Sequence, residues 1–346
     1  MKWRTTIKAV VLASLLIFGA AGPDQADEGP WQIALEEIEG SMQYEYARKF
    51  VEILEAGSIG GVHCRIRPYG ELGTSGDITQ LLQDGAIQFA FQSPGHLGAI
   101  IPEVQVFSIH YLFPTDSKQL ENMLRRGPNT RQVLGKYYRK HQLELLSIIE
   151  EGWQIWTANK PIRRPKDFEG VTFRVMTSPL LITAYRLYGA YAITVPYSQI
   201  YGDLELGRID AETQPFFAIQ EMKFYEVQDY MINARQLPFI ATFVANRDFM
   251  DALPEEHRKV IRAAIEAADD YIFDLEARLN AERFEMIMKA KPSMHYIELT
   301  EAEIDAFRNK GLPLRDKYLE MGGEGAREVL NAVLKDKAWV EKGLED

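Results

Sequence analysis

The chain has one cysteine, Cys64, among its 346 residues, so it cannot form an internal disulfide bond. The segment VHCRIR around it alternates in polarity, which favours a strand with Cys64 packed in a core over a reactive thiol. Without a disulfide, the fold depends on its packed interior for stability. The length and the 46% of hydrophobic residues are sufficient for two compact lobes.

Metal and cofactor motifs are missing as well. The six histidines stand singly, no CxxC pair occurs, and the glycine patterns of phosphate-binding and dinucleotide-binding loops and of G-x-S-x-G nucleophiles are absent. We therefore expect no bound metal and no cofactor. No stretch gathers enough basic residues to bind a duplex, and the net charge of -11 argues against a nucleic-acid partner.

The first 26 residues have the pattern of an export signal. Three basic residues within positions 2–8 precede an apolar run at 9–18, and small residues at 19–21 supply a cleavage site. The alternative is a membrane anchor, but the apolar run falls short of the roughly 20 residues that a spanning helix needs. The sequence therefore predicts a signal peptide over residues 1–26 and a mature chain exported to the periplasm.

Strand and helix patterns alternate through the first two thirds of the chain. The segments WQIALE, VHCRIR and IQFAF predict strands, with helices at 42–56 and about 77–83 between them. The pattern restarts with the strand TFRVM, a helix at 179–188 and the strand AYAITVP. Such alternation predicts two α/β lobes, each with a largely parallel sheet. A cleft between two lobes is the usual place for a small ligand.

A helical segment from Pro254 to Lys291 is much longer than the average helix of about 12 residues. Its length predicts one helix that runs along both lobes. We expect lobe I to comprise residues 27–150 and about 240–278. Lobe II is expected to comprise residues 151–239 and about 279–346, with ordered strands crossing between the lobes.

Arg174 is the sharpest functional signal. It lies within the predicted strand TFRVM, and Ser178 and Pro179 then form a good N-cap and first residue of a helix. The guanidinium is therefore expected at the carboxyl end of a strand, where open α/β sheets bind ligands, beside a helix N-terminus that favours anions. The alternative is a salt bridge between the lobes to a glutamate, and the residues alone leave both readings open.

Two further groups are candidates for a site. Glu36, Glu37 and Glu39 could act as the acid and base of a glycosidase, although acidic residues at a strand end are more often solvated or face a ligand. Among the aromatic residues, Trp153 is the candidate for a pocket wall.

Several segments occur in the order found in one known family. The segments RPYGELG, FRVMTSPLL, VPYSQIYGDLELGRIDAETQP, MKFYEVQDY and LPEEHRKVI resemble the extracytoplasmic solute-binding proteins of tripartite ATP-independent periplasmic (TRAP) transporters, the DctP family. The resemblance implies a two-lobed, periplasmic-binding-protein-like α/β fold with a long helix bracing both lobes. It also implies a small organic-acid ligand, no catalysis, and two membrane partners, a small and a large transporter subunit.

The resemblance places Arg174 where family members grip the carboxylate of the ligand. A planar guanidinium can hold a carboxylate through two hydrogen bonds, and the cost of burying it is offset when the anion arrives and the lobes close. By the same matching, the other residues that line the pocket are Glu36, Gln92, Ser93, Gln154, Thr177, Tyr197 and Gln214.

Two positions depart from the family pattern. Many members have a second arginine where this chain has Gln154, and an asparagine where it has Gln214. The loss of a cation, together with the possible anion Glu36, argues against a dicarboxylate. It favours a hydroxy, amino or aromatic monocarboxylate, on whose flat part Trp153 could stack.

Two other functions stay open at this point. An exported hydrolase would use the Glu36 cluster, and a sensor protein would report the ligand to a receptor instead of a transporter. For the solute-binding function we expect a monomer.

Overall fold

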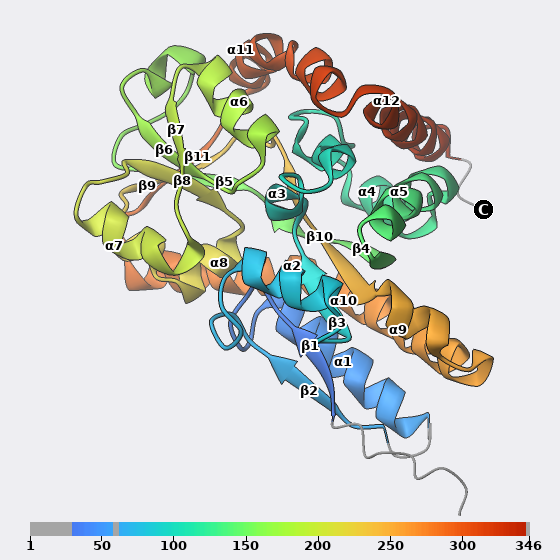
Figure 1. Cartoon of the computed structure of the whole chain (residues 1–346). Helices are drawn as coiled ribbons and strands as arrows, with labels where there is room; N and C mark the ends of the chain where they lie inside the picture. The colour runs from blue at the N-terminus through green and yellow to red at the C-terminus, as the bar shows by residue number, and fades with distance from the viewer. Residues whose placement is uncertain (1–29, 58–61, 344–346) are drawn as a thin grey trace, which may run out of the picture.

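The computed structural model describes residues 30–57 and 62–343, so the predicted signal peptide at 1–26 lies outside the described residues. Two β-sheets lie next to each other, joined by strands that pass between them, and helices pack around both (Figure 1). The predicted α/β fold with two lobes is confirmed. No helix within the described residues is both long and apolar enough to cross a membrane.

The first sheet has five strands in the order β2-β1-β3-β10-β4. Strand β1 pairs in parallel with β2 and β3, whereas β10 is antiparallel to β3 and β4. The strands are β1 (Trp31–Ala34), β2 (Cys64–Arg67), β3 (Phe89–Gln92), β4 (Leu143–Trp153) and β10 (Pro238–Asn246). The helices of this part are α1 (Met42–Ala56), α2 (Ser75–Gln83), α3 (Pro94–Leu97), η1 (Pro102–Ser108), α4 (Ser117–Arg126), α5 (Pro128–Lys140) and α9 (Arg247–Ala252).

The second sheet has six strands in the order β11-β9-β5-β8-β6-β7. Its strands are β5 (Ile155–Ala158), β6 (Thr172–Val175), β7 (Tyr191–Thr194), β8 (Ala211–Gln214), β9 (Tyr230–Asn233) and β11 (His295–Glu298). Its helices are η2 (Pro165–Phe168), α6 (Pro179–Tyr188), η3 (Tyr197–Gln199), α7 (Ile200–Glu205), α8 (Phe216–Glu221), η4 (Phe224–Glu226) and α11 (Glu301–Gly311).

Both sheets are mixed, which corrects the prediction of largely parallel sheets. Strand β4 leaves the first sheet and continues after one residue, Gln154, into β5 of the second sheet. The chain returns through residues 234–237, which join β9 to β10. Because β10 enters the first sheet from the end at which β4 leaves it, the two strands run antiparallel. These two crossing segments connect the lobes.

The long helix α10 (Glu255–Ala290) confirms the prediction of one helix over residues 254–291. It packs against α1 and β4 of the first sheet and against α8 of the second. Its buried polar residues serve as anchors. The carboxylate of Asp269 accepts hydrogen bonds from the hydroxyls of Tyr46 at 2.9 Å and Ser147 at 2.6 Å. Further along, the amide Nδ2 of Asn280 donates to the carbonyl oxygen of Glu151 at 3.0 Å.

The last helix, α12 (Leu314–Glu341), bends at Gly323, whose φ of 57° is not helical. It packs against α4, α5 and η1, and also against α6 of the second sheet. The carboxylate of Asp336 accepts hydrogen bonds from the backbone nitrogens of Asn129 at 3.2 Å and Thr130 at 2.6 Å, and so holds the start of α5. Because α12 touches elements of both sheets, the boundary of lobe II at the C-terminus stays a prediction.

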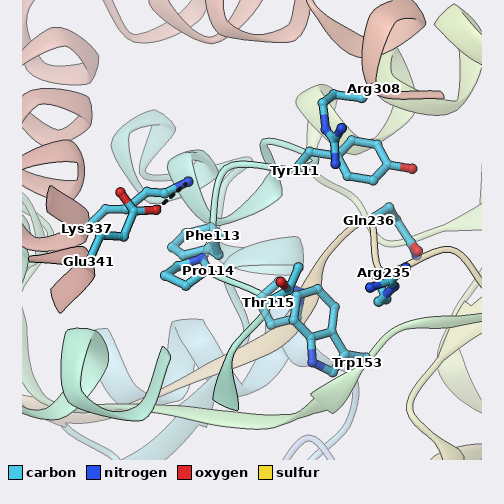
Figure 2. Close-up of a pocket in the computed structure, with 11 residues that line it drawn as sticks. Tyr111, Phe113, Pro114, Thr115, Trp153, Arg235, Gln236, Arg308, Lys337 and Glu341 are labelled. Atoms are coloured by element: carbon cyan, nitrogen blue, oxygen red, sulfur yellow. Dashed lines mark ion pairs between the residues drawn. The ribbon is translucent and has the colours of Figure 1, made fainter. Parts of the chain in front are cut away.

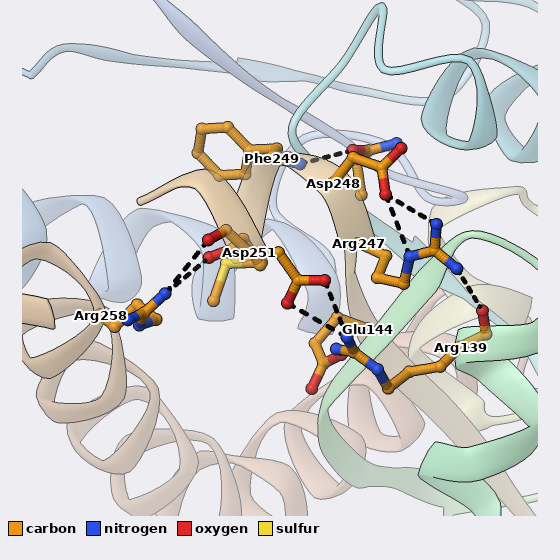
Figure 3. A network of polar contacts seen from close by, with 9 residues as sticks. Arg139, Glu144, Arg247, Asp248, Phe249, Asp251 and Arg258 are labelled. Atoms are coloured by element: carbon orange, nitrogen blue, oxygen red, sulfur yellow. Dashed lines mark hydrogen bonds and ion pairs between the residues drawn. The ribbon is translucent and has the colours of Figure 1, made fainter. Parts of the chain in front are cut away.

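A polar network fixes α9 to the edge of the first sheet (Figure 3). The guanidinium of Arg139, on α5, forms ion pairs with Glu144 of β4 and Asp251 of α9. Arg247 donates to the carbonyl oxygen of Arg139 at 3.1 Å. The network joins α5, β4 and α9, and the long helix α10 follows α9 in the chain.

Candidate functional site

Arg174 lies inside the protein at the end of β6, with 1% of its surface exposed. Its Nε donates a hydrogen bond to the carbonyl oxygen of Val195 at 3.0 Å. Ser178 caps α6 by accepting from the backbone nitrogen of Leu181, and Pro179 is the first helical residue. The predicted strand, cap and helix around Arg174 are therefore present.

No carboxylate within residues 30–57 and 62–343 forms an ion pair with Arg174. Burial lowers its pKa from 12.5 to about 10, while the charge of Glu212 acts in the opposite direction. At neutral pH the guanidinium is still charged. The part of the structure described thus contains a buried cation without a carboxylate partner, which is the arrangement expected for a site that receives an anion.

A small cavity of about 30 Å³ adjoins Arg174 between the two sheets. Five of the predicted site residues meet there, namely Glu36, Ser93, Arg174, Tyr197 and Gln214. They come from both lobes, because the first two follow strands β1 and β3 and the others follow or end strands β6, β7 and β8. The other lining residues are Glu37, Gln43, Ser75, His96, Met176 and Phe239.

Glu36 supplies a negative charge to the same cavity. Its Oε2 accepts hydrogen bonds from the backbone nitrogen of Ser93 at 2.7 Å and from the Ser93 hydroxyl at 2.5 Å. Its Oε1 is buried and has no hydrogen-bond partner among the described residues. Burial raises the pKa of Glu36 from 4.5 to about 7, and the hydrogen bonding of Ser93 and Ser75 opposes that rise. One oxygen of Glu36 is therefore available to a donor on a ligand.

Glu37 and Glu151 form a second acidic pair behind Glu36. Burial raises the pKa of Glu37, and burial together with the charge of Glu37 raises the pKa of Glu151 well above its ordinary value. Ionising both buried carboxyls is unfavourable, which favours the protonated form of one of them. The pair therefore adds less negative charge to the cavity than its two carboxyls suggest.

The two lobes touch each other beside this cavity. The backbone nitrogen of Ser178 donates to the carbonyl oxygen of Gly95 at 2.8 Å, and the Thr177 hydroxyl donates to the carbonyl oxygen of His96 at 3.3 Å. A Cβ at Gly95 would lie 2.3 Å from Cε of Met176, so a side chain there would require Met176 to move. We call this the closed arrangement, since residues 93–96 of one lobe meet residues 176–178 of the other.

A larger cavity of about 390 Å³ continues from the small one. The two share Ser75, His96, Met176 and Tyr197. Burial, together with the charge of Arg174, lowers the pKa of His96 from 6.5 to about 3, so its imidazole is neutral. The space around Arg174 and Glu36 therefore extends into a wider compartment with mostly apolar walls.

Four predicted site residues lie elsewhere. Thr177 lines the larger cavity, whereas the amide of Gln92 accepts a hydrogen bond from the Thr79 hydroxyl and lines none of these cavities. Gln154 lines a separate space of about 10 Å³, and Trp153 lines a third cavity together with Arg235. Neighbouring residues of a strand point to opposite sides, which agrees with Ser93 lining the small cavity while Gln92 does not.

Several lining residues were missed from the sequence. His96 and Met176 follow predicted site residues within three positions, so the turns after β3 and β6 gave a usable signal. Phe239 comes from the returning crossing strand, and Gln43 from the face of α1. Nothing in the local pattern distinguishes these two from ordinary core residues. Within the described residues no group of three or more potential metal ligands is assembled.

Comparison with known proteins gives a consistent result. The chain matches the family described as bacterial extracellular solute-binding protein, family 7 (DctP), over residues 34–321. It is 34% identical to the ectoine/5-hydroxyectoine-binding periplasmic protein UehA of Ruegeria pomeroyi, over 96% of this chain and 97% of the relative.

Two solved structures share the fold at appreciable identity. The periplasmic ectoine-binding protein of the TeaABC TRAP transporter of Halomonas elongata has a TM-score of 0.87 at 33% identity, covering 90% of this chain and 99% of that one. A TRAP solute-binding protein of Marinobacter aquaeolei, in an open form without ligand, has a TM-score of 0.83 at 39% identity, covering 88% and 99%.

Proposed function

Because the chain belongs to the DctP family, the family 7 extracellular solute-binding proteins of TRAP transporters, we propose that it captures a small zwitterionic monocarboxylate. The ligand carries one carboxylate and one protonated nitrogen group. It is held between the lobes in the periplasm and handed to the small and large membrane subunits of a transporter. The chain acts as a monomer and catalyses no reaction.

One observation carries this proposal: two buried, opposite charges adjoin the same cavity without pairing with each other. Arg174 has no carboxylate partner within the described residues, and Oε1 of Glu36 has no donor. Each unpaired buried group is unfavourable by itself. A ligand with a carboxylate for Arg174 and an N–H group for Glu36 satisfies both at once.

The carboxyl group of Glu36 in this cavity disfavours a dicarboxylate ligand. From the sequence, Gln154 in place of a second arginine also disfavoured such a ligand, but Gln154 does not line the cavity around Arg174. A second carboxylate on the ligand would meet the Glu36 carboxylate. Trp153 lies in another cavity, so it contributes no wall to this one.

Ectoine is the first ligand to test, because UehA and TeaA are named for binding it and because it combines a carboxylate with a charged cyclic amidine. A ligand that binds only the folded protein stabilises it by about 2.7 kcal/mol at a hundred times its Kd. We therefore expect ectoine, or another zwitterionic monocarboxylate, to raise the melting temperature, and succinate to have no effect.

Single substitutions test the contributions of Arg174 and Glu36 separately. Arg174→Ala is expected to abolish the shift. Glu36→Gln is expected to weaken binding of a zwitterion more than binding of a hydroxy acid that has no amino group. Arg315→Ala, an exposed cation on α12, is the matched control. Strong binding of succinate, with no binding of any amino, hydroxy or aromatic monocarboxylate, would contradict the proposal.

A further inference from the structure

A separate cavity lies against the crossing segments, away from Arg174. Its volume is about 240 Å³, and its lining includes Tyr111, Trp153, Arg235, Gln236, Arg308 and Lys337 (Figure 2). Of the described residues, none that lines it also lines the cavity around Arg174. We call this space the hinge cavity.

The hinge cavity is bounded by parts of both lobes. Trp153 ends the crossing strand β4, and Arg235 and Gln236 lie in the segment that returns from β9 to β10. Arg308 projects from α11, which packs on α6 and η2 of the second sheet. Lys337 projects from α12, which packs on α4 and α5 of the first. The shape of the cavity therefore depends on how the lobes are arranged.

Polar atoms around this cavity have no partner. The Tyr111 hydroxyl, Nε of Arg235 and Oε1 of Gln236 are buried without a hydrogen bond to any described residue. Leaving such a group unsatisfied costs about 1–3 kcal/mol. Gln236 is 1% exposed, and its Nε2 already donates to the carbonyl oxygen of Gln154 at 3.0 Å.

The backbone is also strained here. Tyr111 has a φ of 61° and Arg235 a φ of 47°, a region that side chains other than glycine rarely adopt. The backbone nitrogen of Tyr111 donates to the carbonyl oxygen of Gln236 at 2.8 Å, which ties the two strained segments together. Strain of this kind, held by surrounding contacts, is concentrated at functional sites.

The charge of the lining is positive, in a protein whose net charge is -11. Three cations and one carboxylate, Glu341, line the cavity, and each cation forms an ion pair with an exposed carboxylate. The pairs are Arg235 with Glu301, Arg308 with Asp305, and Lys337 with Glu341. Lys337 also donates a hydrogen bond to the carbonyl oxygen of Leu112 at 2.8 Å. Exposed pairs contribute about 0–1 kcal/mol, so they leave most of the attraction for an entering anion.

The walls add an apolar, aromatic surface. Trp153 and Phe113 line the cavity together with Pro114 and Pro238, and the guanidinium of Arg308 lies 5.4 Å from the centre of the Tyr111 ring. Flat aromatic groups stack on such rings and on guanidinium planes. The volume is below the roughly 300–1,000 Å³ of sites for drug-sized ligands, so the occupant is small.

We propose that the hinge cavity is a second binding site, for a small carboxylate with a flat apolar body, such as an aromatic carboxylate. The carboxylate meets the guanidinium of Arg308, and the flat body lies against Trp153. An inorganic anion would gain nothing from the apolar walls. Because the cavity is formed by both lobes in the closed arrangement, its occupant stabilises that arrangement.

The test uses Arg174→Ala as the background, so that binding between the lobes cannot mask the hinge cavity. Benzoate is titrated into this protein by calorimetry, with sulfate as an inorganic anion and benzyl alcohol as a neutral aromatic molecule. We expect benzoate to bind, and sulfate and benzyl alcohol to bind at least tenfold more weakly. Small-angle X-ray scattering should show a smaller radius of gyration with benzoate than without it.

A second substitution added to the Arg174→Ala background tests whether benzoate binds in the hinge cavity. Arg308→Met added to the background is expected to weaken benzoate binding at least tenfold, and Trp153→Leu to weaken it several-fold. Arg315→Met removes an exposed cation from the neighbouring helix and should leave binding unchanged. Absence of benzoate binding, equal binding of sulfate, or full retention in Arg308→Met would overturn the site. An unchanged radius of gyration with bound benzoate would overturn its link to closure.

Discussion

Replacing Arg174 by methionine should abolish ligand binding and at the same time stabilise the empty protein. Arg174 is 1% exposed and pairs with no carboxylate within the described residues. Methionine has a similar length without the charge, so the change removes the cost of keeping a cation inside the fold. Residues that serve binding at the expense of stability are common at functional sites.

The magnitude follows from the pKa of the guanidinium. Burial lowers that pKa from 12.5 to about 10, and each unit corresponds to about 1.4 kcal/mol. The charged side chain therefore costs about 3 kcal/mol in the folded state. Methionine gives up the hydrogen bond from Nε to the carbonyl oxygen of Val195, which costs about 1–2 kcal/mol when that oxygen is left unpaired. The net expectation is a gain of about 1–2 kcal/mol.

Urea unfolding of the ligand-free proteins measures this change directly. The midpoint should move to higher urea at an unchanged m-value, while calorimetry shows no binding of the ligand found for the wild-type protein. Arg315→Met, at an exposed position, should stay within about 0.5 kcal/mol of the wild type. A loss of 2 kcal/mol or more in Arg174→Met would refute the reasoning, because it would mean that the cation has a structural partner.

Further predictions concern Glu36, the long helix and the crossing strand. Because burial raises the pKa of Glu36 to about 7, the affinity for a zwitterion should fall as pH decreases below about 7, approaching tenfold per unit, and calorimetry at several pH values should show a flat profile in Glu36→Gln. The raised pKa of Glu36 also lowers the stability of the empty wild-type protein as pH rises from about 4.5 to 7. The Glu36→Gln variant should therefore be more stable than the wild type at pH 8, and this difference should disappear at pH 4. Asp269→Ala leaves the buried Tyr46 hydroxyl without its acceptor and should cost about 2 kcal/mol or more in urea unfolding, while exposed aspartates of α10 tolerate the change. Gly152→Ala places a Cβ 2.7 Å from Nδ2 of Asn280 at a φ of 120°, so its melting temperature should fall by several degrees, and an unchanged value would contradict the packing described for the crossing strand.

Local patterns predicted much of the fold because they depend on neighbours in the chain. The strand around Arg174, the Ser178 cap with Pro179, and the helix over residues 254–291 all follow from propensity, capping and periodicity. The resemblance to TRAP solute-binding proteins is confirmed by the family match over residues 34–321. The mixed sheets escaped prediction, since strand direction depends on the route of the returning chain.

The site was predicted in part for the same reason. Arg174, Glu36 and Ser93 lie at strand ends, where the fold class alone indicates a ligand. Trp153 and Gln154 lie in a crossing segment, and the direction of their side chains depends on the turn of the chain between two sheets. Adjacent residues there face different cavities, and the sequence has no pattern that assigns them.

The sequence by itself determined the α/β class, the long helix and a cation at the end of a strand, because each results from interactions between residues close in the chain. Only the tertiary structure decided that Arg174 pairs with no carboxylate in the described part of the protein, that Glu36 adjoins the same cavity, and that a second cationic cavity lies at the crossing segments. Those features depend on which side chains from distant segments meet. That outcome is set by the packing of two lobes, a long-range property that local patterns do not contain.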